Sequence, residues 1–139
     1  MFSKVYSGGL RGIDGYVVQV EADVSDGLPG FYMVGSLASE VREAEERVRT
    51  AMRNAGFHLS ARKITVNLSP ANVRKEGTAC DLPVAIAVLA AYGIVMPSGL
   101  KQTGFLGELG LDGKIKPVRG VLSMVLAMAE KGLERCFLP

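Results

Sequence analysis

The chain has 139 residues, a length typical of one domain, and a chain of this size needs no disulfide or metal to complete its core. Its composition, 48% apolar and 22% charged residues, is that of a soluble globular protein. The net charge of +2 is too small to indicate nucleic-acid binding by charge alone, although it leaves local basic clusters open.

The first residues, MFSKVYSGGLRG, lack the apolar core of a signal peptide. The longest apolar run, from Leu82 to Tyr92, is far shorter than the ~20 residues that a membrane span requires. Cys80 and Cys136 have neither CxxC spacing nor a histidine at ligand spacing, so we interpret them as reduced thiols. Together these features predict a cytoplasmic protein without a membrane contact.

The segment YVVQVEADV, residues 16–24, alternates between apolar and polar side chains and predicts a half-buried strand. Its inward face consists of Val18, Val20, Ala22 and Val24. The turn formers of SDGLPG follow, and FYMVG, residues 31–35, predicts a second short strand. A hairpin of these two strands is the simplest arrangement.

From Ser39 to Ala55 the apolar period changes to that of a helix. Its predicted inward face consists of Val41, Ala44, Val48, Ala51, Met52 and Ala55. Two Glu-to-Arg pairs at i,i+4 spacing begin at Glu43 and Glu45 and indicate a solvated opposite face. Gly56 supplies the helix end.

RKITVNLSP, residues 62–70, alternates again and predicts a strand with Ile64, Val66 and Leu68 inward. The charged stretch RKEGTACDLP, residues 74–83 (the opening loop), then leads into a helix that is apolar on every side from Val84 to Ala91. We expect Asp81 to be the N-cap of this central, buried helix. A glycine-bearing loop at such a position is where proteins place a phosphate site or a nucleophile.

In GFLGELGLDGKIKPV, residues 104–118, the pair Asp112-Gly113 predicts a tight hairpin. A third helix is predicted from Val121 to Lys131, and RCFLP, residues 135–139, begins another strand. We expect residues 1–139 to form one domain cut from a longer chain. Strands and helices without strict alternation predict an α+β fold with helices packed on a mixed sheet.

The sequence argues against several chemistries within these residues. Gly113-Lys114 is followed by Ile115 instead of the Ser or Thr of a phosphate loop, so ATP is not expected to bind this chain. The single histidine, His58, follows a helix end and is interpreted as a structural surface residue rather than a triad member. No cluster of metal-ligating residues occurs.

NLSPANVRKEGTACDLPVAIAVLAA and GFLGELGLDGKIKPVRGVLSMVLAMAEKG resemble the proteolytic domain of the Lon proteases, which use a serine–lysine dyad. Lys75-Glu76-Gly77 matches that family's Lys-Asp-Gly. The position of the nucleophilic serine falls on Ala79 and that of the dyad lysine on Leu122. The resemblance therefore implies the fold without both catalytic side chains, and a residual peptidase that uses Cys80 or Thr78 is one alternative function.

A longer resemblance covers nearly the whole chain. DGLPGFYMVG, REAEERVRTAMRNAGF, RKITVNLSPAN and LGELGLDGKIKPVRGVL, in this order, resemble the N-terminal domain of the magnesium-chelatase-like ComM/YifB family. This implies a ribosomal protein S5 domain 2-like, Lon-type fold that precedes an AAA+ ATPase module. It further implies a hexameric, ATP- and Mg²⁺-dependent parent protein that acts on DNA in branch migration, recombination and transformation.

In this interpretation the opening loop is structural: Gly77 permits its turn and Asp81 caps the helix. The remaining functional hypothesis is a DNA phosphate contact at the helix N-terminus. Its candidate residues, with the first pair in the loop expected to be exposed, are Arg74, Lys75, Arg62, Lys63 and Asn67. A solvated loop without DNA contact, and an oligomerisation scaffold without nucleic acid, are the alternatives. No catalytic residue, cofactor site or metal site is predicted within the chain.

Overall fold

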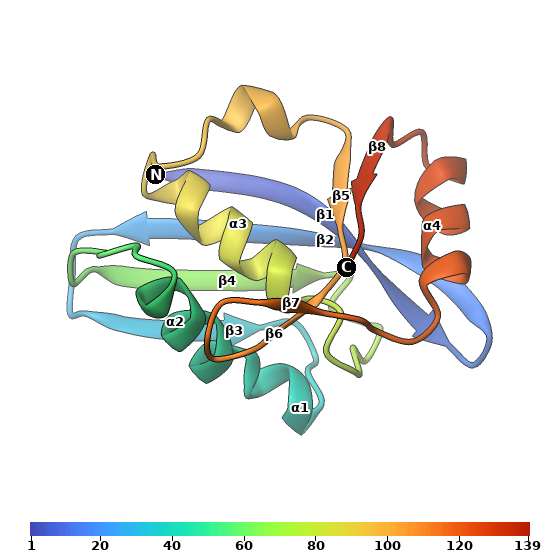
Figure 1. The fold of residues 1–139 in the computed structure, drawn as a ribbon, viewed down its shortest axis with the longest axis horizontal. Helices are drawn as coiled ribbons and strands as arrows, with labels where there is room; N and C mark the ends of the chain where they lie inside the picture. Colours follow the sequence, from blue (N-terminus) through green and yellow to red (C-terminus); the bar gives the residue numbers. More distant parts are fainter.

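The computed structural model describes all residues 1–139 and contains a six-stranded sheet, a two-stranded hairpin and four α-helices (Figure 1). The strands are β1 (Phe2–Arg11), β2 (Asp14–Ser25), β3 (Gly30–Val34), β4 (Lys63–Ser69), β5 (Thr103–Phe105), β6 (Glu108–Leu109), β7 (Ile115–Lys116) and β8 (Arg135–Phe137). The helices are α1 (Ser39–Arg42), α2 (Ala44–Asn54), α3 (Asp81–Ala91) and α4 (Val121–Glu130), with one 3₁₀ turn at Pro97–Leu100.

The large sheet has the order β3-β4-β2-β1-β5-β8 and is mixed. β2 pairs antiparallel with both β1 and β4, whereas β3 pairs parallel with β4 and β5 lies parallel between β1 and β8. The predicted strands 16–24, 62–70 and 135–139 are confirmed as β2, β4 and β8. The predicted inward faces of the first two of these strands are buried.

The predicted hairpin between residues 16–24 and 31–35 is wrong. β4 lies between β2 and β3, so β3 pairs only with β4. The connection from Asp26 to Pro29 is longer than a two-residue hairpin turn, and it carries the chain past the start of β4. The hairpin partner of β2 is β1, which the sequence did not reveal because the glycines of SGGLRG are typical of a turn.

Two of those glycines are required by close contacts rather than by a turn. A Cβ on Gly8 would lie 2.7 Å from the Cβ of Met124, and a Cβ on Gly9 would lie 2.5 Å from the ring of Tyr16. The actual turn is at Gly12, which has φ +65°. Gly8 therefore lets α4 approach the sheet closely.

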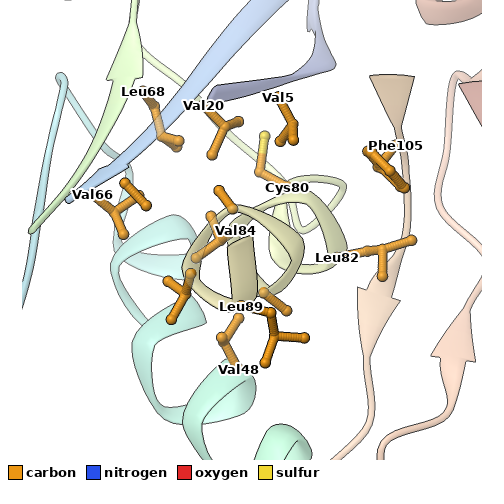
Figure 2. Close-up of a cluster of buried hydrophobic side chains, with 14 of the residues drawn as sticks. Val5, Val20, Val48, Val66, Leu68, Cys80, Leu82, Val84, Leu89 and Phe105 are labelled. Carbon is orange, nitrogen blue, oxygen red and sulfur yellow. The ribbon is translucent and has the colours of Figure 1, made fainter. Parts of the chain in front are cut away.

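α3 is the central helix of the core, as the sequence predicts. Figure 2 shows Val84 and Leu89 of this helix between the sheet residues Val20 and Val66 and the α2 residue Val48. Every α3 residue except Ile86 is buried. Fully burying a side chain of this size contributes roughly 1.5–3 kcal/mol, so this helix accounts for much of the hydrophobic stabilisation.

α4 covers the opposite face of the sheet. Val17 packs with Met124 and Met128, whereas the adjacent Val18 packs into the core around α3. Neighbouring residues of a strand point to opposite faces, so α3 and α4 lie on the two sides of the β1–β2 hairpin. In Figure 1 α4 lies at the right-hand end of the molecule and leaves the rest of that sheet face open.

The remaining predicted elements are mostly confirmed. The Asp112-Gly113 hairpin forms as β6 and β7, and the third helix forms as α4. The single helix predicted from Ser39 to Ala55 is divided at Glu43 into α1 and α2, and Ala55 is exposed rather than inward. The α+β class with helices packed on a mixed sheet is confirmed. None of the helices is both long and apolar enough to cross a membrane.

Candidate functional site

The opening loop is fixed at both ends by hydrogen bonds from distant parts of the backbone. The N–H of Lys75 donates to the carbonyl of Ser36 at 2.9 Å, and the N–H of Ala38 donates to the carbonyl of Lys75 at the same distance. Farther along, the N–H of Gly107 donates to the carbonyl of Ala79 at 3.0 Å. The loop is therefore held between the segment before α1 and the segment before β6.

The side chain of Lys75 is buried, with only 2% of its surface exposed. Its Nζ donates to the carbonyls of Gly35, at 2.6 Å, and Pro70. Burial lowers the pKa of this ammonium group. The prediction that Lys75 is exposed for a phosphate is wrong, because the ammonium is used to join two loops that would otherwise leave buried carbonyls without donors.

Asp81 is also part of a buried link and is not the helix cap. Cys80 occupies the N-cap position without a side-chain cap hydrogen bond. The Asp81 carboxylate instead accepts from Nε and Nη2 of Arg47, at 2.7 and 3.0 Å, and from the N–H of Leu109 at 3.1 Å. This bidentate pair connects α2 and the β6–β7 hairpin to the start of α3.

The pKa values of both partners in this link are shifted. The hydrogen bond that Arg47 donates to Asp81 raises the pKa of Arg47. Burial raises the pKa of the Asp81 carboxyl, while hydrogen bonds from Arg47 and the N–H of Leu109 act in the opposite direction. Arg47 also donates to the carbonyl of Glu40 at 2.7 Å, and the N–H of Gly77 donates to the Glu40 carboxylate at 3.0 Å. No buried side-chain nitrogen or oxygen of the link therefore lacks a hydrogen-bond partner.

A hollow of about 370 Å³, the loop hollow, lies beside the opening loop. Its wall includes Gly77, Thr78 and Ala79 from the loop, Arg119 just before α4 and Met124 within α4. Leu122, the other dyad position implied by the resemblance, does not line the hollow and is 72% exposed. The two positions that match the Lon dyad are thus occupied by methyl and isobutyl groups, and only one of them borders the hollow.

The neighbouring nucleophiles lack an activating base. Cys80 is buried, its thiol lies 3.6 Å from the hydroxyl of Ser7, and burial raises its pKa to about 11. Activation would need a lowered thiol pKa. Thr78 lines the loop hollow, but its side chain has no hydrogen bond to a base.

Of the predicted phosphate contacts in the loop, Arg74 remains exposed at 63% and lies 3.9 Å from the carboxylate of Glu76. Two arginines that sequence reasoning missed border the same region: Arg11 at the β1–β2 turn and Arg119 before α4. They could not be grouped with Arg74 from the sequence, because only the fold brings these segments together.

The other predicted contact residues are not near the opening loop. Arg62 pairs with Asp26 at 3.2 Å, and Lys63 lies over the ring of Tyr32 at 5.8 Å. Both lie where β4 begins, whereas the loop follows its other end, and six strand steps separate the ends by about 20 Å. Asn67 donates to Glu21 at 2.9 Å on the open face of the sheet. The five residues therefore do not form one patch.

The structure offers no ligand set for a phosphate loop or a metal. Gly113-Lys114 lies in the turn between β6 and β7 rather than at a helix N-terminus, so the residues present do not fit ATP. No group of three or more His, Cys, Asp or Glu side chains is placed to hold a metal ion.

Comparison with known proteins identifies a family and several relatives. The family model described as subunit ChlI of Mg-chelatase matches residues 20–139. Competence protein ComM of Haemophilus influenzae is 46% identical over 123 residues, which are 88% of this chain and 24% of that protein. The Escherichia coli protein YifB is 40% identical over 130 residues, which are 94% of this chain and 26% of that protein.

A more distant relative bears on the fold. Lon protease of Mycolicibacterium smegmatis is 28% identical over 139 aligned residues, 94% of this chain and 17% of that protein. This likeness agrees with the Lon-type fold that the sequence predicts. The chain spans about a quarter of the length of the ComM and YifB relatives that it matches.

Proposed function

Because the chain belongs to the Mg-chelatase-like ChlI family and has ComM and YifB proteins as relatives, we propose that it is the non-catalytic N-terminal domain of an ATP-driven protein that acts on DNA. The observation that carries the non-catalytic part is the role of the opening loop. The side chains of Lys75 and Asp81 are engaged in internal hydrogen bonds, and Ala79 occupies the position that matches the Lon nucleophile.

The DNA-directed part of the proposal rests on the family and on the name of the ComM relative, which is a competence protein. The resemblance implies branch migration in recombination and transformation by a cytoplasmic, hexameric ring that uses ATP and Mg²⁺. The ATP site belongs to another part of that protein in this proposal, and no residue of this chain is assigned to it.

Within the domain, we propose that duplex phosphates contact Arg11, Arg74 and Arg119 beside the opening loop. All three are exposed, come from three separate segments and border two neighbouring hollows that share Glu76 in their lining. Glu76 and Asp14 border the same region and limit its net positive charge, so the contact is expected to be weak and sensitive to salt.

ATP hydrolysis by the complete gene product tests the proposal. Adding branched DNA should raise the hydrolysis rate severalfold, and deleting residues 1–139 should reduce this stimulation without abolishing basal hydrolysis. Hydrolysis indifferent to DNA would contradict the DNA-directed role. Degradation of an unstructured protein substrate by residues 1–139 alone would contradict the non-catalytic role.

A second candidate function, an oligomerisation scaffold without DNA contact, is favoured by one specific feature. The outward face of α4 exposes Leu122 and Leu126, and the adjacent edge strand β8 exposes Phe137. Exposed apolar side chains beside a free strand edge are typical of an interface. Sedimentation velocity of the wild type and of Leu122→Gln/Leu126→Gln tests this: assembly lost in the variant and unaffected by DNA favours the scaffold.

A further inference from the structure

A second hollow, the α2–β4 hollow, lies where β4 begins and away from the opening loop. Figure 1 shows this end of β4 on the left. It has a volume of about 430 Å³, within the range of small-ligand pockets. Residues of α2, the connection to β4, the start of β3 and the end of α3 line it. Its floor is apolar and includes Phe31, Met52 and Ile64.

Three arginines line this hollow: Arg49 and Arg53 from α2 and Arg62 from the connection. Arg49 lies 6.0 Å above the ring of Phe31 and 3.4 Å from the carboxylate of Glu45. Arg62 lies 3.2 Å from the fully solvated carboxylate of Asp26. Arg53 has no ion pair.

The two existing ion pairs are exposed and therefore weak, so a bound anion can replace either carboxylate at little cost. Three planar guanidinium groups around one hollow, with a single histidine, His58, beside them, favour an anionic ligand. The paired acids Glu45 and Asp26 do not line the hollow, so they do not block it.

Besides Phe31, two further aromatic side chains line the hollow, Phe57 and Tyr92. Phe57 is 37% exposed, and the hydroxyl of Tyr92 donates to the carbonyl of Ser60 at 2.7 Å, which fixes the position of its ring. Exposed aromatic faces beside arginines are the combination that binds stacked bases and backbone phosphates of a single strand.

We propose that the α2–β4 hollow binds a nucleotide unit of a single DNA strand, with the base against the aromatic and apolar floor and the phosphates at Arg49, Arg53 and Arg62. This rests on the proposed function, in which the complete protein acts on DNA. A duplex keeps its bases stacked and paired, so it cannot offer one to a hollow of this kind.

An acidic peptide is the competing anionic ligand, and the backbone of the hollow disfavours it. A peptide that binds by adding a strand to a sheet is recognised through main-chain hydrogen bonds. Here the N–H of Gly30 already donates to the carbonyl of Arg62, and the N–H of Phe57 donates to the carbonyl of Met52. Recognition here rests on side-chain charges and rings, and the rings favour a base over an acidic side chain.

The test is fluorescence anisotropy of a labelled oligothymidylate with the chain across a series of salt concentrations. The variant Arg53→Gln/Arg62→Gln should weaken binding about tenfold, and the slope of log K against log salt should fall by about 1.4 for two lost strand phosphates. Phe57→Ala should weaken binding about fivefold or more without changing the slope. Circular dichroism establishes that each variant is folded.

The matched control is Arg42→Gln/Lys131→Gln, which removes two exposed cations that form no ion pair and lie outside the hollow. It should leave the affinity within about twofold of the wild type. Equal losses in the control and in the hollow variant would overturn the proposal, because binding would then follow net charge alone. Absence of oligothymidylate binding at low salt, or displacement of it by an acidic peptide that binds more tightly, would also overturn it.

The same variants separate this proposal from the proposed function. If the complete protein carrying Arg53→Gln/Arg62→Gln keeps full stimulation of ATP hydrolysis by single-stranded and branched DNA, the hollow is not the strand site but the DNA-directed role stands. If the wild type shows no stimulation, the proposed function fails independently of the hollow.

Discussion

At the scale of single residues, Lys75 shows how a charged side chain in a loop becomes structural. Its ammonium joins the carbonyls of Gly35 and Pro70, which come from two different connections of the chain. The sequence shows a lysine beside a helix N-terminus, where an anion site is a reasonable prediction. It cannot show that carbonyls from residue 35 and residue 70 meet there, because that depends on the pairing of β3 with β4.

Lys75→Ala should lower the free energy of unfolding by about 2–4 kcal/mol, since it leaves a cavity and two carbonyls without their donor. The adjacent Arg74→Ala is the matched control and should change it by less than about 0.5 kcal/mol because Arg74 is exposed. Urea unfolding followed by circular dichroism measures both. Similar losses for the two variants would show that Lys75 is not buried.

Cys80 should be unreactive in the folded chain. Burial raises its pKa from the ordinary 9.0 to about 11, so at pH 8 about one thiol in a thousand is ionised. A pKa raised by folding favours the protonated fold below about pH 9, and this contribution is lost as the pH rises toward 11. Iodoacetamide labelling read by mass spectrometry should be negligible at pH 8, with the less buried Cys136 as internal reference. Rapid labelling of Cys80 near neutral pH would instead reveal an activated nucleophile.

At the scale of the elements, the Asp81–Arg47 pair decides how α2, α3 and the β6–β7 hairpin are joined. Asp81 is 1% exposed and Arg47 is 20% exposed, so the pair is largely removed from water. Sequence reasoning detected only the helix-surface neighbours of Arg47 at i,i+4 spacing. The stronger partner is 34 residues away and is invisible to local patterns.

Removing either partner, by Asp81→Ala or Arg47→Ala, should cost about 2–4 kcal/mol of stability, because the remaining charge loses its partner. The double variant should cost less than the sum of the two, with a coupling energy of at least about 1 kcal/mol. The exposed i,i+4 pair of Glu45 and Arg49, treated in the same way, should give about 0.3–0.5 kcal/mol. Strict additivity of the Asp81 and Arg47 losses in urea unfolding would refute the structural link.

Element prediction succeeded where the apolar period was long and failed where neighbours were decided by topology. The alternation of residues 16–24 and 62–70 and the uniformly apolar 84–91 segment correctly predicted β2, β4 and α3. The sequence did not predict β1, because its glycines, which leave space for Met124 and Tyr16, are atypical of a strand. The predicted pairing of β3 was wrong because β4, which comes later in the chain, lies between β3 and β2.

At the scale of the whole molecule, the two ends of the sheet carry different arginine groups. Arg11, Arg74 and Arg119 lie beside the opening loop, and Arg49, Arg53 and Arg62 surround the α2–β4 hollow. A net charge of +2 hides both groups, because acidic residues elsewhere compensate for them. The predicted contact patch combined residues of the two ends, and the structure separates them.

In the proposed function the domain helps an ATP-driven protein to act on DNA, and movement of a DNA branch point tests this most directly. The complete gene product would be mixed with a fluorescent four-way junction, with ATP and Mg²⁺ or with a non-hydrolysable ATP analogue. We predict conversion of the junction into separate duplexes only with hydrolysable ATP, and slower conversion when Arg11, Arg74 and Arg119 are replaced by glutamine. A junction that stays intact with ATP, in a protein that hydrolyses ATP equally well without DNA, would contradict the account.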